Sequence, residues 1–198
     1  FGLYGNRLFV DFEERFLRRN IERALLRGFL NPLEWFSSRD RTAMAVSYYQ
    51  QTLFGNATFA DLMRKDAPLI LINTSDLGSG ARFSFAQEYF DLLCSDLTTF
   101  PVARAVTASS AVPVVFDPVV VENYSGCARN APAWLAAAQK RDSDNPNLGM
   151  IVQGDAAFEN KVVHRYAQFV DGGITDNLGL RAMLDTIEKV WTDDGVPE

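Results

Sequence analysis

The sequence predicts an α/β fold in which helices flank a central sheet. Residues 68–74 are a short apolar run bounded by chain breakers, which is typical of a strand covered on both faces. Residues 164–170 form a second extended run, and they lead through Asp171-Gly172-Gly173 into a helix whose apolar stripe begins at Leu180. With 198 residues, 47% of them hydrophobic, the chain can bury one core and suits a single domain over 1–198.

Helical patterns dominate the first part of the chain. Apolar residues at three-and-four spacing predict a helix over 8–27, which Gly28 ends. Another helix is expected near 39–53 and a short one after Thr58, a plausible cap. This aromatic-rich region either covers an acyl-chain pocket or only packs against the core.

Shorter elements follow the apolar run of 68–74. Small residues predict a helix over 102–111 that ends before Pro113. Extended runs at 114–116 and 118–121 are expected near a sheet edge, because proline interrupts them. An excursion from the core over about 123–161 then precedes the strand that ends at Asp171.

Asp171 stands where the strand ends and a helix begins, which is where open α/β sheets keep their chemistry. Gly172 and Gly173 permit positive φ and leave no Cβ to obstruct another backbone or a ligand. Asp-Gly is also a common turn pair, so a plain tight connection is the alternative interpretation. Asp176 and Asn177 are expected to cap the following helix; a Ca²⁺ loop from the three oxygen-bearing side chains is disfavoured, since the EF-hand spacing is missing.

Charge and composition limit the classes of function. The formal charge is −6; residues 1–41 carry eight Arg against six acidic residues, or +2, so the remainder carries −8. An acidic body argues against a nucleic-acid partner, whereas the Arg-rich first helix either meets an anionic lipid surface or is a solvated face. A single histidine, His164, excludes multi-histidine zinc sites and makes a Ser-His-Asp triad unattractive. Cys94 and Cys127 are free thiols or one bridge.

Three stretches together resemble the patatin-like phospholipase family. They are Thr58-Phe59-Ala60-Asp61-Leu62, residues 105–113, and the strand, Asp-Gly-Gly and helix around Asp171, and the resemblance covers roughly 1–122 and 162–191. It implies a three-layer α/β fold and a lipid acyl hydrolase with a Ser–Asp dyad, in which Asp171 is the base. Gly172 and Gly173 then form the backbone turn beside the oxyanion, and the substrate is a phospholipid or other acyl ester. No metal or organic cofactor is required.

The resemblance is incomplete in one respect. The family's Gly-rich oxyanion loop and Gly-x-Ser-x-Gly elbow do not occur, because Leu77 and Ala81 flank Gly78-Ser79-Gly80 where the elbow needs glycines. We expect the serine within about ten residues before Phe1, on the same chain or on a separate one, so that this stretch alone is inactive. A non-catalytic lipid-binding or interaction module on the same fold is the alternative.

Overall fold

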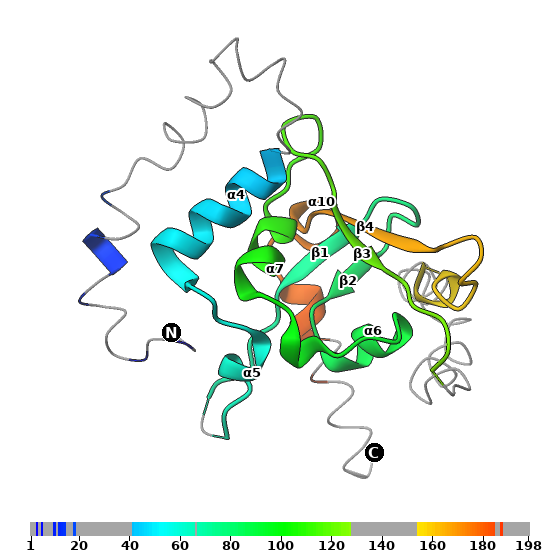
Figure 1. Cartoon of the computed structure of the whole chain (residues 1–198), viewed down its shortest axis with the longest axis horizontal. Helices are drawn as coiled ribbons and strands as arrows, with labels where there is room; N and C mark the ends of the chain where they lie inside the picture. The colour runs from blue at the N-terminus through cyan, green and yellow to red at the C-terminus, as the bar shows by residue number, and fades with distance from the viewer. Residues whose placement is uncertain are drawn as a thin grey trace.

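The computed structural model describes residues 41–127 except Asp66, residues 154–184 and Ile187, together with Leu3, Gly5, Val10, residues 12–14 and Arg18. These residues form a four-stranded sheet with helices, a mixed α/β fold (Figure 1). The predicted fold class is therefore confirmed. Most of the helix predicted over 8–27 and the middle of the predicted excursion lie outside the described residues.

The sheet has the order β2-β1-β4-β3, and every neighbouring pair is antiparallel. Its strands are β1 (Asn73–Asp76), β2 (Arg82–Ser84), β3 (Val119–Glu122) and β4 (Tyr166–Asp171). The register sets Thr74 opposite Asp171, so the end of β4 lies beside the start of β1. The strand at 118–121 was expected near an edge, and β3 is an edge strand of this sheet.

The helices agree with the predicted ranges where these were made. They are α4 (Arg41–Tyr49), the π-helix η3 (Gln50–Phe54), α5 (Phe59–Leu62), α6 (Gln87–Leu92), the 3-10 helix η4 (Leu97–Thr99), α7 (Val102–Ser109) and α10 (Gly173–Asp176). At the start of α5, the Thr58 backbone N–H donates to the Asp61 carboxylate at 2.9 Å. Helices α6, η4 and α10 were not predicted, and the helix expected after Asp176 is seen at residues 180–184.

The two faces of the sheet carry different side chains. Since side chains alternate along a strand, Thr74, Phe83 and Phe169 share one face. This face packs on α7, where the Thr74 hydroxyl donates to the Ala108 carbonyl at 3.4 Å, and α4 lies on α7 (Figure 1). Aromatic rings fill the core there: Phe59, Phe83, Phe85, Phe90, Phe100, Phe158 and Phe169.

The other face is more polar and meets α10. Ser75 and Arg82 lie on it, and the Ser75 and Thr175 hydroxyl oxygens are 2.9 Å apart, in hydrogen bond. Arg82 is only 4% exposed, although its side chain is charged. The sheet is thus covered by α7 on one side and by α10 on the other, and Asp171 lies at the end of β4 between them.

Two strand predictions were wrong in their bounds. The apolar run of 68–74 does not form the strand; β1 begins at Asn73, and Leu69 is 74% exposed. The polar side chains of β1 can be buried because they have partners, such as the Thr74 hydroxyl, which donates to the Val170 carbonyl. Residues 114–116 are a turn rather than an extended run: Val114 has φ +76° and is 97% exposed.

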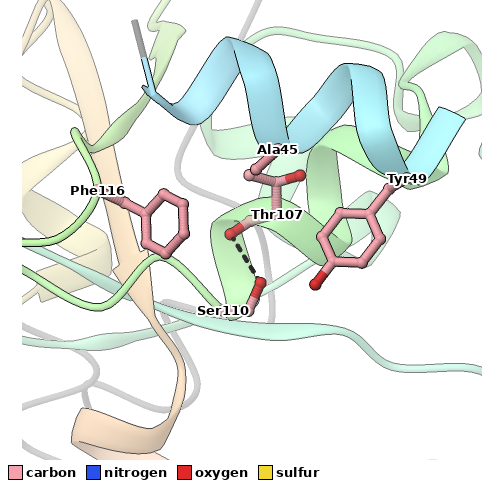
Figure 2. A pocket seen from close by; sticks show the side chains of 5 residues that line it. All are labelled: Ala45, Tyr49, Thr107, Ser110 and Phe116. Carbon is pink, nitrogen blue, oxygen red and sulfur yellow. Dashed lines mark hydrogen bonds between the residues drawn. The ribbon is translucent and has the colours of Figure 1, made fainter. Parts of the chain in front are cut away.

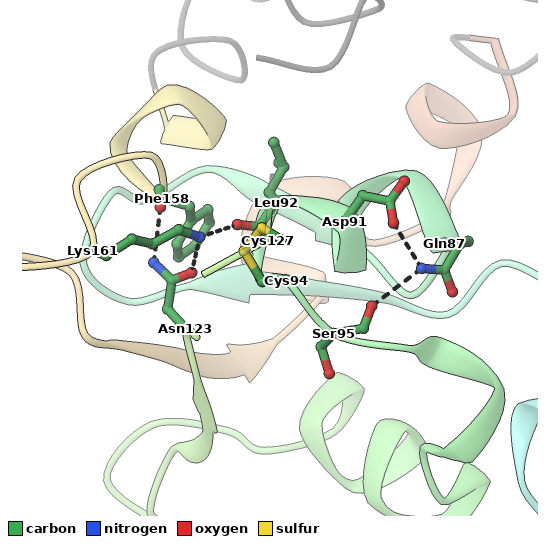
Figure 3. The surroundings of a disulfide bond; sticks show 9 residues. All are labelled: Gln87, Asp91, Leu92, Cys94, Ser95, Asn123, Cys127, Phe158 and Lys161. Carbon is green, nitrogen blue, oxygen red and sulfur yellow. Dashed lines mark hydrogen bonds between the residues drawn. A yellow bond between two sulfur atoms is a disulfide. The ribbon is translucent and has the colours of Figure 1, made fainter. Parts of the chain in front are cut away.

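Cys94 and Cys127 form a disulfide, which settles the choice that the sequence left open. The bridge ties the end of α6 to the segment after β3 (Figure 3). Beside it, the Lys161 ammonium donates to the Leu92 carbonyl and to Asn123 Oδ1, and Asn123 Nδ2 donates to the Phe158 carbonyl at 2.9 Å. In the part of the chain that the structure describes, no helix has the length and apolar character to cross a bilayer.

Candidate active site

Asp171 is the last residue of β4, and its backbone is held by hydrogen bonds to carbonyls at the end of α7 and just after it. The Asp171 N–H donates to the Ala111 carbonyl at 2.9 Å, and the Gly172 N–H donates to the Ser109 carbonyl at 3.1 Å. The carboxylate is partly buried, and its Oδ1 accepts from the Gly173 N–H at 2.7 Å. The side chain is therefore positioned by backbone groups before any ligand binds.

The two glycines act through space rather than through unusual backbone angles. A Cβ on Gly172 would lie 2.4 Å from the Asn73 carbonyl oxygen, so β1 can approach only a residue without a side chain. A Cβ on Gly173 would lie 3.1 Å from Asp171 Oδ1 and 3.2 Å from Asn177 Oδ1. The positive φ that glycine permits is not used here: Gly172 has φ −64°, and Gly173 is not among the glycines with positive φ.

Both glycine N–H groups have acceptors inside the protein. The Gly172 N–H is bonded to Ser109 and the Gly173 N–H to Asp171. Neither is free to donate to a substrate oxyanion. We therefore assign the two glycines to the backbone turn and expect oxyanion donors from another part of the protein.

Asp171 opens into a cavity of about 460 Å³. This volume lies within the range of roughly 300–1,000 Å³ that is usual for small-molecule sites. The lining comes from the approach to β1, the end of α7 and the turn after β4: Leu71, Ile72, Asn73, Val106, Ser109, Ser110, Asp171, Gly172, Gly173, Asp176, Asn177, Leu178 and Gly179. The lining of the cavity is part apolar and part polar.

Three polar residues of this cavity were not singled out from the sequence. Ser109 and Ser110 end α7, and Asn73 begins β1. For the two serines, the sequence did offer a signal, because they end the small-residue helix that precedes Pro113. In the structure, the end of this helix is bonded to the strand that carries Asp171. Asn73 had no comparable signal, because its location depends on antiparallel pairing with a strand about a hundred residues later.

Asp176 caps the helix that follows, as predicted. Its carboxylate accepts from the Ala182 N–H at 2.9 Å and from the Arg181 N–H at 3.4 Å. It also lies 3.6 Å from the Arg82 guanidinium, with both side chains almost fully buried. Asn177 lines the cavity, and no capping bond of its side chain is seen. Among the described residues, no group of three His, Cys, Asp or Glu side chains could hold a metal ion.

Asp155 is a further buried carboxylate that interacts with the charges of Arg82 and Asp76, and it was missed by the sequence reasoning. It is 1% exposed, and its Oδ2 has no hydrogen-bond partner. Burial raises the pKa of Asp155 well above its ordinary value; the Arg82 charge opposes this shift and the Asp76 charge adds to it. Its neighbour Gly154 contacts Ala81 so closely that a Cβ would lie 2.3 Å away, which holds Asp155 in the interior.

Ser79 is a turn residue, as predicted, and does not face Asp171's cavity. Its hydroxyl donates to Asp76 Oδ2 at 2.8 Å, and its N–H donates to the same oxygen at 2.8 Å. Of the Arg-rich first segment, Arg18 pairs with Glu13 at 2.9 Å on the exposed surface. Leu3 packs at the margin of the core.

Comparison with protein families agrees with this arrangement. The family described as patatin-like phospholipase matches residues 4–184, which is well over half of the chain. No curated protein and no solved structure matches it in the corresponding comparisons. The family suggests lipid acyl hydrolase activity. With a mixed α/β fold and a match of this length, the chain belongs to the patatin-like phospholipase family.

Proposed function

We propose that the protein hydrolyses acyl esters of lipids through a Ser–Asp dyad, with Asp171 as the base. The observation that carries this proposal is the position of the Asp171 carboxylate, which is fixed at the end of β4 and borders a cavity of about 460 Å³. A phospholipid or another acyl ester is the substrate. The nucleophile in this proposal is a serine upstream of Phe1, so the 198 residues alone are expected to be inactive.

A serine hydroxyl needs a positioned base, because it is a poor nucleophile until its proton is removed during attack. In the proposed reaction, the serine oxygen attacks the ester carbonyl while Asp171 accepts the hydroxyl proton. The proton then passes to the departing alcohol. Water, activated by the same carboxylate, attacks the acyl-enzyme, and the fatty acid and the free serine result.

The turn around Asp171 suits this role for a physical reason. The Gly173 N–H holds one carboxylate oxygen at 2.7 Å, which leaves the other oxygen available to a proton donor. The apolar part of the lining, including Leu71, Ile72 and Val106, limits water around the acyl chain. Oxyanion donors from upstream complete the site, and the loss of one such donor typically lowers the rate by about 10²–10³.

The test replaces Asp171 with Asn in the intact protein and measures ester hydrolysis. The amide keeps an oxygen for the Gly173 N–H but cannot accept the serine proton, so we expect kcat/KM to fall by about 10²–10⁴. Asp96→Asn is the matched control, because Asp96 is exposed and does not line the cavity. Near-normal turnover by a folded Asp171→Asn protein would refute the assigned role.

A lipid-binding module without catalysis is the second candidate, and one observation favours it. The 198 residues contain no Gly-x-Ser-x-Gly sequence. The roughly twenty codons before Phe1 distinguish the two candidates: a Gly-x-Ser-x-Gly there supports the enzyme, and its absence supports the module. If the serine segment is a separate chain, mixing the two chains should restore hydrolysis.

We further propose peripheral contact with anionic lipid through the Arg-rich segment near the start of the chain. Its eight arginines in residues 1–41 contrast with the charge of −8 on the rest. Binding to vesicles that contain an anionic phospholipid should weaken as salt rises, because exposed charges are screened over about 8–10 Å at physiological salt. Equal binding to neutral and anionic vesicles would contradict this contact.

A further inference from the structure

A small apolar recess lies between α4 and α7, separate from the main body of the Asp171 cavity (Figure 2). Its volume is about 80 Å³. Five residues line it, and we call it the α4–α7 slot: Ala45, Tyr49, Thr107, Ser110 and Phe116. None of them is charged, and the Tyr49 and Phe116 rings stand on opposite sides of it (Figure 2).

Two of the three hydroxyls at the slot, those of Thr107 and Ser110, donate to carbonyls of α7, and the third, on Tyr49, stands beside the slot (Figure 2). The Thr107 hydroxyl donates to the Ala103 carbonyl at 2.8 Å, within its own helix. The Ser110 hydroxyl donates to the Val106 carbonyl at 3.0 Å and to the Thr107 carbonyl at 3.3 Å. Because the Thr107 and Ser110 hydroxyls already have acceptors, the surface that the slot offers a ligand is mainly carbon. A polar group would lose its hydrogen bonds with water on entering the slot, whereas an apolar group has none to lose.

The slot adjoins the Asp171 cavity at one residue. Ser110 lines both spaces, and α7 supplies neighbouring walls, with Thr107 facing the slot and Val106 and Ser109 facing the cavity. Because both spaces share Ser110, they are neighbours at the end of α7, and an acyl chain whose carbonyl lies beside Asp171 would pass this end to enter the slot. The slot is mainly apolar, as the tail of an acyl chain requires.

We propose that the α4–α7 slot receives the end of the acyl chain and sets the preferred chain length. This inference rests on the proposed hydrolase function and adds the determinant of its specificity. An apolar cavity of about 150 Å³ accepts a benzene ring, so a slot of this size has room for roughly three carbons. Of the five lining residues, Ala45 has the smallest side chain, and it is 2% exposed, so a larger side chain there would take up this room.

The test measures kcat/KM of the intact protein for p-nitrophenyl esters of increasing acyl-chain length. Each buried methylene contributes a factor of about four to kcat/KM. Once the chain is long enough to reach the slot, kcat/KM should rise about fourfold per carbon for roughly three carbons, about 60-fold in total, and then level off.

Two substitutions change the slot in opposite directions. Ala45→Leu adds three carbons and fills it, so the final rise of about 60-fold should disappear while the acetyl ester is hydrolysed as before. Ala43→Leu is the matched control, because Ala43 is exposed on the same helix. Phe116→Ala enlarges the slot, and the levelling should move to longer chains.

The proposal is overturned if Ala45→Leu and Ala43→Leu give the same chain-length profile, or if Ala45→Leu lowers acetyl and long-chain esters by the same factor. If Ala45→Leu does not fold, an unchanged profile in Phe116→Ala overturns it. If the protein shows no hydrolysis that depends on Asp171, the proposed function fails. The slot is then tested separately by measuring the affinity of n-alkanols for the protein by calorimetry. Affinity that rises about fourfold per carbon and is lost in Ala45→Leu supports the slot, and a flat series sinks it.

Discussion

Gly172 is a position where the backbone of a neighbouring strand leaves no room for a side chain. It follows Asp171 directly, and β1 passes against it: a Cβ would lie 2.4 Å from the Asn73 carbonyl oxygen and 2.9 Å from its carbon. Both atoms belong to the backbone of a central strand that pairs with β2 and β4. Gly172→Ala therefore cannot be accommodated by rotation of a side chain.

The size of the effect follows from the overlap. Ordinary van der Waals contact begins at 3.4 Å, so the strands must separate locally by about 1.0 Å, the difference between 3.4 and 2.4 Å. Overpacking of this kind costs about 1–3 kcal/mol. Alanine can adopt the backbone angles of Gly172, φ −64° and ψ −24°. The substitution therefore also stabilises the protein by about 0.4–1 kcal/mol, because it lowers the conformational entropy of the unfolded chain. We expect a net loss of about 1–2 kcal/mol in the free energy of unfolding.

Urea unfolding and thermal unfolding both measure this loss. For a chain of this length, about 1–2 kcal/mol lowers Tm by roughly 2–8 °C. The control is Gly173→Ala, where the added Cβ would meet side-chain atoms of Asp171 and Asn177 at 3.1 and 3.2 Å. Those side chains can move, so Gly173→Ala should keep stability and lower hydrolysis by displacing the carboxylate. A Gly172→Ala protein as stable as the original would refute the argument from close approach.

Two further predictions concern buried charge and the disulfide. Because the pKa of Asp155 is raised in the folded state, stability should fall as pH rises above the unfolded value of 3.8, where only the folded state keeps the proton. Asp155→Asn should flatten this dependence and stabilise the protein near neutral pH; urea titrations from about pH 4 to about pH 7 test it, and an unchanged slope counts against it. The Cys94–Cys127 bridge closes a loop with a separation of 33 residues, so its removal by the double Cys→Ala variant should cost about 4 kcal/mol in unfolding free energy, and no loss would contradict the pairing.

The predictions from sequence succeeded where the information is local. The end of the strand at Asp171, the cap at Thr58 and the helix over 102–111 depend on patterns within a few residues. The bounds of β1 failed for the opposite reason. The apolar run of 68–74 suggested a buried strand, but the strand is formed by the polar residues that follow, whose hydrogen bonds to α7 and β4 come from distant segments.

The residues of the candidate site also fall into those that the sequence suggested and those that only the structure revealed. Asp171 and its glycines were chosen from their local order, and the structure shows the close backbone approach expected of a residue without a Cβ at Gly172, but no positive φ there. Asn73, Ser110 and Asp155 entered only through the structure, because each owes its surroundings to segments far along the chain.

By itself, the sequence determined the order of strand, acid, glycine pair and helix, since turn chemistry and periodicity act between near neighbours. Tertiary structure alone decided that β1 lies against Gly172, that α7 ends beside Asp171, and that Cys94 meets Cys127. Such contacts join residues separated by tens of positions, and they depend on how the whole chain packs around its aromatic core.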